Sequence, residues 1–351
     1  MQKVLAKIHL GNIRRNAKRF RDLTGTELCA VVKANAYGHG AEEVVNALSG
    51  VADCFAVSII DEAVQIRSAA CGKEILVFSP PITTQDVLLG AWNGFSLTVS
   101  DLIVAKMIDG ISRARKLPIN VHLKINTGMN RYGMGLNELG KVCKRLSVNS
   151  YVNVLGIYSH LYASTSATAE KQRLLFDRAV AVCKGYFPTV KAHLSATYGA
   201  TLGKAFAFDM VRIGLGLYGY FPDGVETQTE LLTLEKGMTV FATALQSRAY
   251  QFGGAGYGEY PFLETPPKDL TVCRYGYADG FLRRRDNGLL GVETQVNNLC
   301  MDACVRKGRL PRGKRFPILL DGSAVAKATG TIVYEVLCAA TRRAEMVYDN
   351  E

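Results

Sequence analysis

The stretch that decides the fold runs from Cys29 to Gly40 and reads Cys-Ala-Val-Val-Lys-Ala-Asn-Ala-Tyr-Gly-His-Gly. Its apolar residues predict a strand that ends on Lys33, and two glycines punctuate the turn that follows. A lysine at the rim of an apolar core loses hydration, so its pKa falls and its free amine becomes a nucleophile. Such a lysine can form a Schiff base with an aldehyde. Taken alone, Lys33 is more simply explained as a strand-end side chain that reaches water.

Short apolar runs of this kind alternate with helix-period segments over the first two thirds of the chain. We expect strands at residues 28–33, 54–58, 74–78, 95–99, 119–125, 153–158, 191–195 and 210–214. The segments between them predict helices, at residues 41–48, 61–69, 84–91, 101–115, 137–147, 170–184 and 197–205. Eight strands that alternate with helices are typical of a TIM-type (β/α)8 barrel. An open doubly wound sheet is the alternative, because a sequence does not show closure.

After Gly224 the pattern changes to short strands separated by glycine and proline. We expect strands at residues 239–250, 270–275, 291–297, 301–306 and 316–320, with at most one helix, near 333–340. The sequence therefore predicts a barrel domain at residues 1–228 and a mostly β domain at residues 229–351. We also expect the first few residues to pair with the β domain.

Composition excludes several classes of function. The 351 residues carry a net charge of +11, but the 42 lysines and arginines are spread along the chain, so we do not expect nucleic-acid binding. The charge suits anionic small molecules instead. Nine cysteines at irregular spacing predict reduced thiols rather than disulfides or a metal site. Neither a membrane span nor a signal peptide is evident, so we expect a cytoplasmic protein.

Reactive groups of barrel enzymes lie at the carboxyl ends of the strands. Polar residues follow several of the predicted strands: Lys33, Lys124, His160, Ser195 and Arg212, with Arg131 on the loop after the fifth. Each is weak evidence by itself, since His160 could be a core histidine and Ser195 a helix cap. Together they predict one pocket.

Several blocks of the sequence, taken with the lysine stretch, resemble one enzyme family. Residues 31–40 resemble the pyridoxal-phosphate attachment motif of the alanine racemases, which are fold-type III enzymes, almost residue for residue. Further blocks follow in family order at residues 123–131, 158–160, 193–196, 210–214, 276–280, 300–302 and 332–335. The resemblance covers nearly the whole chain. It implies an isomerase that interconverts L-alanine and D-alanine and supplies D-alanine for cell-wall peptidoglycan.

The resemblance implies a role for each matching residue around the cofactor, pyridoxal 5'-phosphate. Lys33 would hold the cofactor's aldehyde, and Arg212 would face the pyridine nitrogen and keep it unprotonated, because a guanidinium retains its protons. The phosphate would be held by Ser195, Gly214, Leu215, Tyr37 and Tyr334. Arg131 would contact the cofactor's phenolic oxygen and the substrate carboxylate, and Met301 would contact the substrate. His160 would bridge Arg212 to the second catalytic base. Lys124 matches a lysine that some members carry as a carbamate, although an unmodified lysine is equally compatible with the sequence.

Racemisation needs two bases, one on each face of the α-carbon. The resemblance assigns Lys33 to one face and Tyr257 to the other. Glu259 and Tyr260 depart from the family pattern after Tyr257, so Tyr260 is the fallback candidate. Asn126 stands where many members carry aspartate, and the segment after Cys338 keeps little of the usual ending, which predicts shortened last strands.

The resemblance also implies a homodimer in which the β domain of one subunit completes the partner's pocket, with Tyr257 and Met301 crossing the interface. A serine or broad-specificity racemase is the nearest alternative, but Tyr334 would leave little room for a longer substrate side chain. A non-catalytic pyridoxal-phosphate carrier is a second alternative, which the β domain disfavours. A fold-related decarboxylase is a third, and it would need a cysteine motif that Cys300-Met301-Asp302 does not match.

Overall fold

The computed structural model describes every residue except 1–3, 163–164, 225–231, 253, 258–266 and 282–298. The chain divides into two compact units. The barrel unit contains Arg14–Ala36 and Ala41–Glu235, and the β-rich unit contains Met1–Ile13, Tyr37–Gly40 and Lys236–Glu351. Helix α1 (Leu10–Thr24) belongs to both units.

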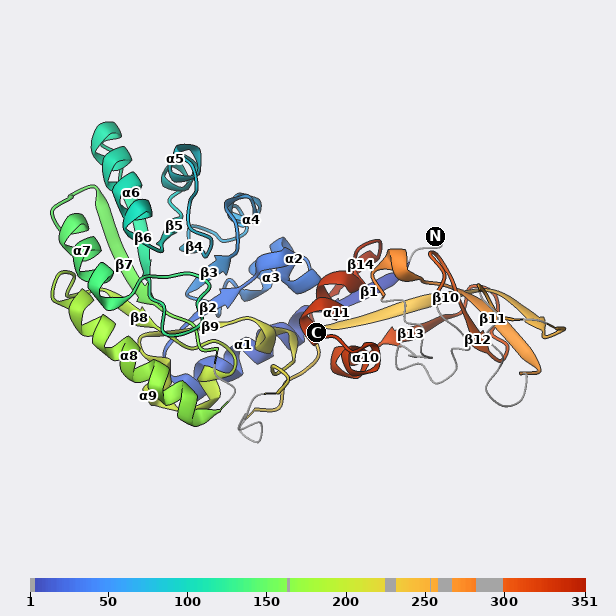
Figure 1. Ribbon diagram of the computed structural model, residues 1–351. Coiled ribbons are helices and arrows are strands. Elements are labelled where there is room, and N and C mark those ends of the chain that lie inside the picture. The colour runs from blue at the N-terminus through green and yellow to red at the C-terminus, as the bar shows by residue number, and fades with distance from the viewer. Residues whose placement is uncertain (1–3, 163–164, 225–231, 253, 258–266, 282–298) are drawn as a thin grey trace. The chain divides into compact units, whose positions relative to one another are not determined.

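Eight parallel strands form the centre of the barrel unit. Their labels can be followed in Figure 1. They are β2 (Glu27–Val31), β3 (Cys54–Val57), β4 (Ile75–Val77), β5 (Ser96–Val99), β6 (Ile119–Lys124), β7 (Val152–Tyr158), β8 (Lys191–His193) and β9 (Met210–Ile213). The sheet order is β8-β7-β6-β5-β4-β3-β2-β9. The two end strands are joined by main-chain hydrogen bonds from Asp209 N to Ala192 O, at 3.0 Å, and from Arg212 N to Ser195 O, at 2.9 Å. The predicted barrel is therefore confirmed, and the open sheet is excluded.

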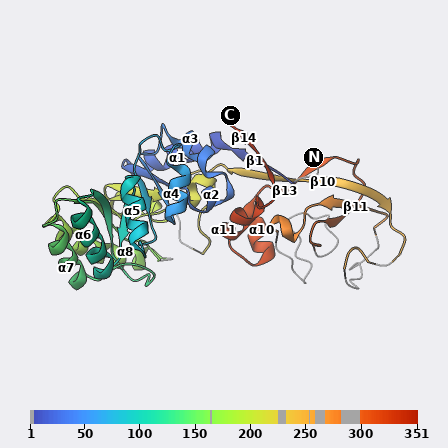
Figure 2. The ribbon, with the colours of Figure 1, turned by 90° about the horizontal axis from the view of Figure 1, so that it is seen from above.

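Helices cover the outside of these strands (Figures 1 and 2). They are α3 (Ala41–Leu48), α4 (Ile60–Ile66), α5 (Thr84–Trp92), α6 (Leu102–Arg115), α7 (Leu136–Leu146) and α8 (Ser166–Lys184). The helix expected at 197–205 is instead two short turns, η1 (Gly199–Thr201) and α9 (Lys204–Ala207). Gly203 lies between them with φ of +101°, a conformation that interrupts a right-handed helix.

The β-rich unit contains a second sheet, with the order β12-β11-β10-β1-β14 and β13 paired to β10. Its described strands are β1 (Leu5–His9), β10 (Met238–Ala249), β11 (Asp269–Arg274), β12 (Cys304–Lys307), β13 (Arg315–Leu319) and β14 (Glu345–Asp349). Strand β1, near the start of the chain, pairs antiparallel with β10 and parallel with β14 in this sheet. The strand expected at 291–297 lies outside the described residues.

The expectation of at most one helix in this part of the chain is wrong. Two helices lie between β13 and β14: α10 (Gly322–Thr329) and α11 (Val333–Ala340). Helix α10 consists mostly of small residues, so its apolar period is weak. Its boundaries do carry a signal, because Asp321 caps the first turn and Gly330 ends it in the left-handed conformation.

Candidate active site

Cationic side chains gather at the carboxyl ends of the barrel strands. Lys124 is the last residue of β6, and Arg212 lies in β9. The Lys124 Nζ and the Arg212 guanidinium lie 4.8 Å and 5.2 Å from the centre of the Tyr158 ring. Arg212, Lys124, Arg131 and Lys33 all act electrostatically on the imidazole of His160. The structure therefore brings together five of the residues predicted to line the pocket.

Because these cationic side chains lie close together, protonation of His160 and Lys124 is unfavourable. Burial, followed by the charges of Arg212 and Lys124, holds the pKa of His160 well below its usual value. Burial, followed by Arg212 and Arg131, does the same to the pKa of Lys124. Among the described residues, neither Lys124 nor Arg212 forms an ion pair with a carboxylate. Such a cluster of cationic side chains suits an anionic ligand.

The Arg212 side chain is fixed by the barrel itself. Its Nη1 group donates to His193 Nδ1 at 2.9 Å and to His193 O at 2.8 Å. Its Nη2 group donates to Ser159 O at 2.6 Å and to Leu194 O at 3.0 Å. Burial lowers the pKa of Arg212 to about 10, so the guanidinium keeps its charge at neutral pH. All four terminal N–H groups are used, and only the Nε–H lacks an acceptor among the described residues.

Two side chains that support Arg212 were not assigned a role from the sequence, although both lie in the quoted blocks. The ring of Tyr158 stacks on the imidazole of His193, with the centres 5.0 Å apart. Burial raises the pKa of Tyr158 to about 12, so the phenol is neutral, and it pairs with Thr98 Oγ1 at 2.8 Å. The aromatic face offers the two cations a favourable contact without a counter-charge.

His160 shares the electrostatic cluster of Arg212, but no hydrogen bond joins the two in the described part of the chain. The imidazole that Arg212 contacts is that of His193. The bridging role of His160 therefore stays a prediction.

The loop after β8 carries two hydroxyl groups with different partners. Ser195 is fully buried, and its Oγ donates to Phe206 O at 2.6 Å. Thr197 Oγ1 accepts the N–H of Gly216 at 3.0 Å, in the turn η2 (Leu215–Tyr218) that follows Gly214. The hydroxyl beside the predicted phosphate-binding main chain is thus that of Thr197. The sequence reasoning missed this residue because Ser195 lies closer to the strand end.

The turn after β2 has an unusual backbone. Element α2 (Lys33–Gly38) has φ of +52° to +55° at Ala34, Asn35, Ala36 and Tyr37, so it is a left-handed turn. Each such residue costs about 1–2 kcal/mol relative to the right-handed form. Part of the turn is held by neighbours in the barrel unit, since Glu62 Oε1 accepts the N–H of Ala34 and Asn35 Oδ1 accepts that of Ala41. Strain of this kind is typical of functional sites.

The β-rich unit brings together the two tyrosines predicted to contact phosphate. The rings of Tyr37 and Tyr334 lie 6.0 Å apart. Burial, followed by the neighbouring Tyr334 phenol, raises the pKa of Tyr37, so its hydroxyl keeps its proton at neutral pH. A Cβ on Gly38 would collide with the carbonyl oxygen of Leu337, which explains why a glycine ends the turn next to α11.

Two further blocks of the β-rich unit are joined by an ion network. The buried Asp279, in the turn η4 (Tyr277–Asp279), accepts from Arg274 at 2.9 Å and from Arg343 at 3.0 Å. Arg343 also donates to Asp302 at 2.8 Å. This network fixes the segment that carries Met301, whose side chain is 53% exposed.

The predicted second base, Tyr257, follows Gly256, which has φ of +91°. Tyr257 is 72% exposed within its unit. The fallback residue Tyr260 and the neighbouring Glu259 lie outside the described residues.

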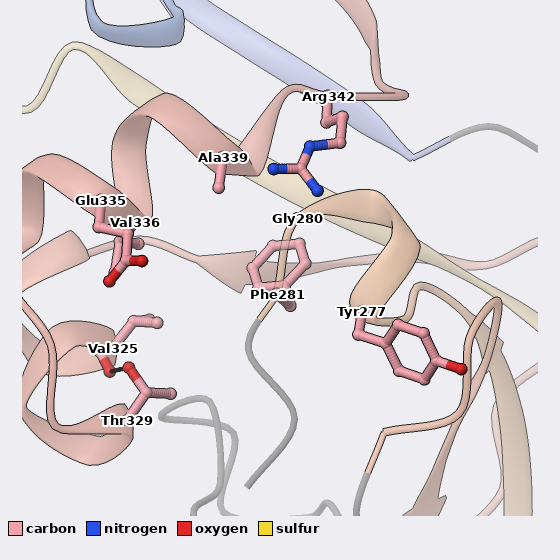
Figure 3. Close-up of a pocket in the computed structure, with 9 residues that line it drawn as sticks. All are labelled: Tyr277, Gly280, Phe281, Val325, Thr329, Glu335, Val336, Ala339 and Arg342. Carbon is pink, nitrogen blue, oxygen red and sulfur yellow. Dashed lines mark hydrogen bonds between the residues drawn. The ribbon is translucent and has the colours of Figure 1, made fainter.

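A cavity of about 200 Å³ lies in the β-rich unit beside α11, as Figure 3 shows. Side chains of η4, α10 and α11, and of the residues that follow η4 and α11, line it: Tyr277, Phe281, Val325, Thr329, Glu335, Val336 and Arg342. The aromatic ring of Phe281 and the aliphatic groups of Val325 and Val336 make much of its wall apolar. The cavity was not predicted from the sequence.

In the described ranges, no three potential metal ligands of the His, Cys, Asp and Glu types come together. The helices of the same ranges are too short or too polar to cross a bilayer. All nine cysteines are free thiols.

Known proteins match almost the whole length of the chain. The model of the alanine racemase N-terminal domain matches residues 8–222, and that of the C-terminal domain matches residues 238–348. Alanine racemase of Lactobacillus delbrueckii subsp. bulgaricus is 31% identical over 370 residues, which cover 98% of this chain and 97% of that protein. Alanine racemase of Pseudomonas entomophila (strain L48) is 32% identical over 355 residues, which cover 96% of this chain and 97% of that protein.

Solved structures agree with these matches. Alanine racemase of Clostridium difficile 630 superimposes with a TM-score of 0.87 at 25% identity, covering 100% of this chain and 97% of that one. The biosynthetic alanine racemase of Pseudomonas aeruginosa gives 0.85 at 26% identity, covering 99% and 100%. From its two matched domains and from relatives that align over almost its entire length, the chain belongs to the alanine racemase family.

Proposed function

We propose that this chain interconverts L-alanine and D-alanine with pyridoxal 5'-phosphate bound at the carboxyl end of the barrel. Membership of the alanine racemase family supports the reaction. The observation that carries the cofactor proposal is the environment of Arg212. In the described part of the chain, four N–H groups of a buried guanidinium are held by the barrel, and the Nε–H remains available beside other cationic side chains.

The residues of the site fit this cofactor. When bound, the cofactor supplies an aldehyde and an electron sink that makes the α-hydrogen of an amino acid acidic. Lys33 would bind the aldehyde, because an amine forms a Schiff base with a carbonyl group. The Nε–H of Arg212 would donate to the pyridine nitrogen and leave that nitrogen unprotonated.

The phosphate would bind where main-chain N–H groups and hydroxyls are concentrated. The first N–H groups of a helical turn have no partner inside it, which suits the role proposed for Gly214 and Leu215. Thr197 adds a hydroxyl that already contacts the same turn. We retain Ser195, Tyr37 and Tyr334 as further contacts, although Ser195 already donates its proton to Phe206 O.

Two groups would move the proton. Lys33 would remove or return it on one face of the α-carbon, and Tyr257 would do so on the other. Arg131 would hold the substrate carboxylate, and Met301 would lie against the substrate. His160 would link Arg212 to Tyr257. Because Tyr257 must act near cations to serve as a base, we propose a homodimer in which the β-rich unit of one subunit completes the partner's pocket.

Lys124 is a candidate for carbamylation. Its amine is buried and its pKa is lowered, so the neutral form that reacts with CO₂ is accessible. A carbamate would place a negative charge beside Arg131 and relieve the repulsion within the cluster. Growth or incubation with ¹³C-bicarbonate should then give a carbamate signal that the Lys124→Met variant lacks.

The function is tested with purified protein, added pyridoxal phosphate and L-alanine or L-serine at equal concentration. We expect D-alanine to accumulate towards an equal mixture of enantiomers, measured by chiral chromatography. Because Tyr334 restricts the space for the substrate side chain, we expect serine to react at least about tenfold more slowly. Faster serine turnover would favour the broad-specificity alternative, and the absence of D-alanine would contradict the proposal.

The shared site is tested by mixing two inactive variants, Lys33→Ala and Tyr257→Phe. In a mixed dimer one pocket carries both changes and the other carries neither. Random exchange should therefore restore about a quarter of wild-type activity under two-fold symmetry. No recovery after demonstrated exchange would mean that both bases come from one chain or that Tyr257 is not a base, and Tyr260→Phe would then be the next variant.

We further propose that the reaction takes place in the cytoplasm and supplies D-alanine for peptidoglycan. The nine free thiols agree with a reducing compartment.

A further inference from the structure

A chain of hydrogen bonds runs through the barrel from Arg212 to Glu74. Arg212 Nη1 lies 2.9 Å from His193 Nδ1, and His193 Nε2 lies 2.8 Å from His122 Nδ1. His122 Nε2 then lies 2.8 Å from Glu74 Oε1. Both imidazoles are buried, whereas the Glu74 side chain is 29% exposed. Glu74 directly precedes β4 and so lies at the amino end of the barrel, whereas Arg212 belongs to the cluster at the carboxyl end. These hydrogen bonds therefore connect the two ends of the barrel.

The partners determine where each proton lies. Arg212 can only donate, so Nδ1 of His193 must accept and its proton lies on Nε2. That proton is donated to Nδ1 of His122, which leaves the proton of His122 on Nε2, facing Glu74. Both histidines are therefore neutral. In this relay of hydrogen bonds from Arg212 through His193 and His122 to Glu74, every N–H points towards the carboxylate.

The surroundings favour this single arrangement. Burial, followed by the charge of Arg212, holds the pKa of His193 well below its usual value. Burial would raise the pKa of Glu74, but the hydrogen bond that neutral His122 donates and, more weakly, Ser96 and Lys191 bring it below its usual value, so the carboxylate is ionised at neutral pH. The Tyr158 ring stacks on His193 and is neutral.

We propose that Glu74 is a positioning residue for Arg212, acting through His122 and His193. Without an acceptor at Glu74, the His122 proton can move to Nδ1 and oppose the proton on His193. His193 would then lose its directed bond, and Arg212 one of its four fixed contacts. The relay does not conduct protons, because its last group, a guanidinium, does not release one. The catalytic part of this inference rests on the function proposed above.

The relay itself is tested without cofactor or catalysis. The chain has five histidines, so ¹⁵N-histidine labelling gives a simple spectrum. In the wild type we expect His122 and His193 as neutral rings with the proton on Nε2. In Glu74→Ala the pattern of His122 should become a mixture of tautomers. Glu27→Ala is the matched control, since Glu27 lies at the same end of the barrel and pairs with Lys191 instead. An unchanged His122 pattern in Glu74→Ala would overturn the inference.

The effect on Arg212 is tested in the loaded enzyme. We expect Glu74→Ala to lower kcat about tenfold, the value of one charge-assisted hydrogen bond, with KM for alanine unchanged. Glu74→Gln keeps an acceptor oxygen and should restore both kcat and the tautomers. Altered tautomers with unchanged kcat, or a failure of Glu74→Gln to restore them, would overturn the positioning role. If Glu74→Ala does not fold, Glu74→Ser gives the same test. An inactive wild type with the expected tautomers would refute the proposed function and leave the relay intact.

Discussion

The two ends of the barrel treat charge in opposite ways. At the amino end, charged groups have partners: Lys191 pairs with Glu27 at 2.7 Å, Arg21 pairs with Asp53 at 3.4 Å, and Glu74 accepts a hydrogen bond from the neutral His122. At the carboxyl end, Lys124 and Arg212 share one aromatic ring and have no carboxylate partner among the described residues. Pairing serves stability, whereas a cluster of like charges costs stability and suits a ligand that brings negative charge.

The largest expected difference between the two ends is in how strongly a substitution lowers racemase activity. We expect Lys33→Ala, at the carboxyl end, to lower racemase activity by at least about 10⁴-fold, because a covalent anchor and a base are lost together. Lys191→Ala, at the amino end, should stay within about twofold, since exposed ion pairs contribute little. Turnover of L-alanine, with circular dichroism to check folding, measures both. Comparable losses in the two variants would remove the distinction between the ends.

The stability of the cofactor-free protein should depend on Arg212 more than on any paired surface arginine. Arg212→Lys has three N–H donors for four acceptors, so at least one buried acceptor loses its partner. We expect the free energy of unfolding in urea to fall by at least about 2 kcal/mol. For Arg21→Lys at the amino end the fall should be below about 0.5 kcal/mol. Equal losses of unfolding free energy in the two variants would show that the buried Arg212 contributes no more to stability than a surface arginine.

Replacing Lys124 should change the free energy of unfolding in the opposite direction. Replacing it with methionine removes a buried like charge, so we expect the cofactor-free protein in CO₂-depleted buffer to gain about 1–2 kcal/mol in unfolding free energy. Lys191→Met should lose up to about 1 kcal/mol. The folded pKa of Lys124 is below the unfolded one, so the cost of its charge is complete below the folded pKa and disappears as pH rises towards about 10.4. The gain from Lys124→Met should shrink over that window, and a gain independent of pH would refute the cause.

The smallest expected effect concerns the left-handed turn. Ala34 is exposed and has φ of +52°, a conformation that glycine adopts without strain. We expect Ala34→Gly to raise the free energy of unfolding by about 1 kcal/mol. Ala181→Gly, in the right-handed α8, should lower it by about 1 kcal/mol. A loss in both variants would indicate that the turn is not strained.

The sequence predicted most of what depends on local pattern. Apolar runs and helix periods located the barrel strands within a few residues, and the strand ends indicated Lys33, Lys124 and Arg212. It did not predict partners that depend on contacts between distant strands. That Arg212 donates to His193, and that Thr197 rather than Ser195 contacts the turn at Gly216, follows from the register of β8 and β9 and the loops after them. Helix α10 was missed because its small residues give a weak period.

The left-handed turn could not be foreseen either. Alanine and tyrosine rarely adopt positive φ, and only surrounding contacts such as that of Glu62 with Ala34 hold them there.

Labelling the cofactor's attachment point tests the central claim most directly, because Lys33 and Lys124 lie at the same end of the barrel and only one should bind it. The protein is incubated with pyridoxal phosphate, reduced with borohydride, digested and mapped by mass spectrometry. We predict that the pyridoxyl group is found on Lys33, that Lys33→Ala loses it, and that Lys124→Met keeps it. Label on Lys124, or on neither lysine, would contradict the assignment of this end of the barrel as the cofactor site.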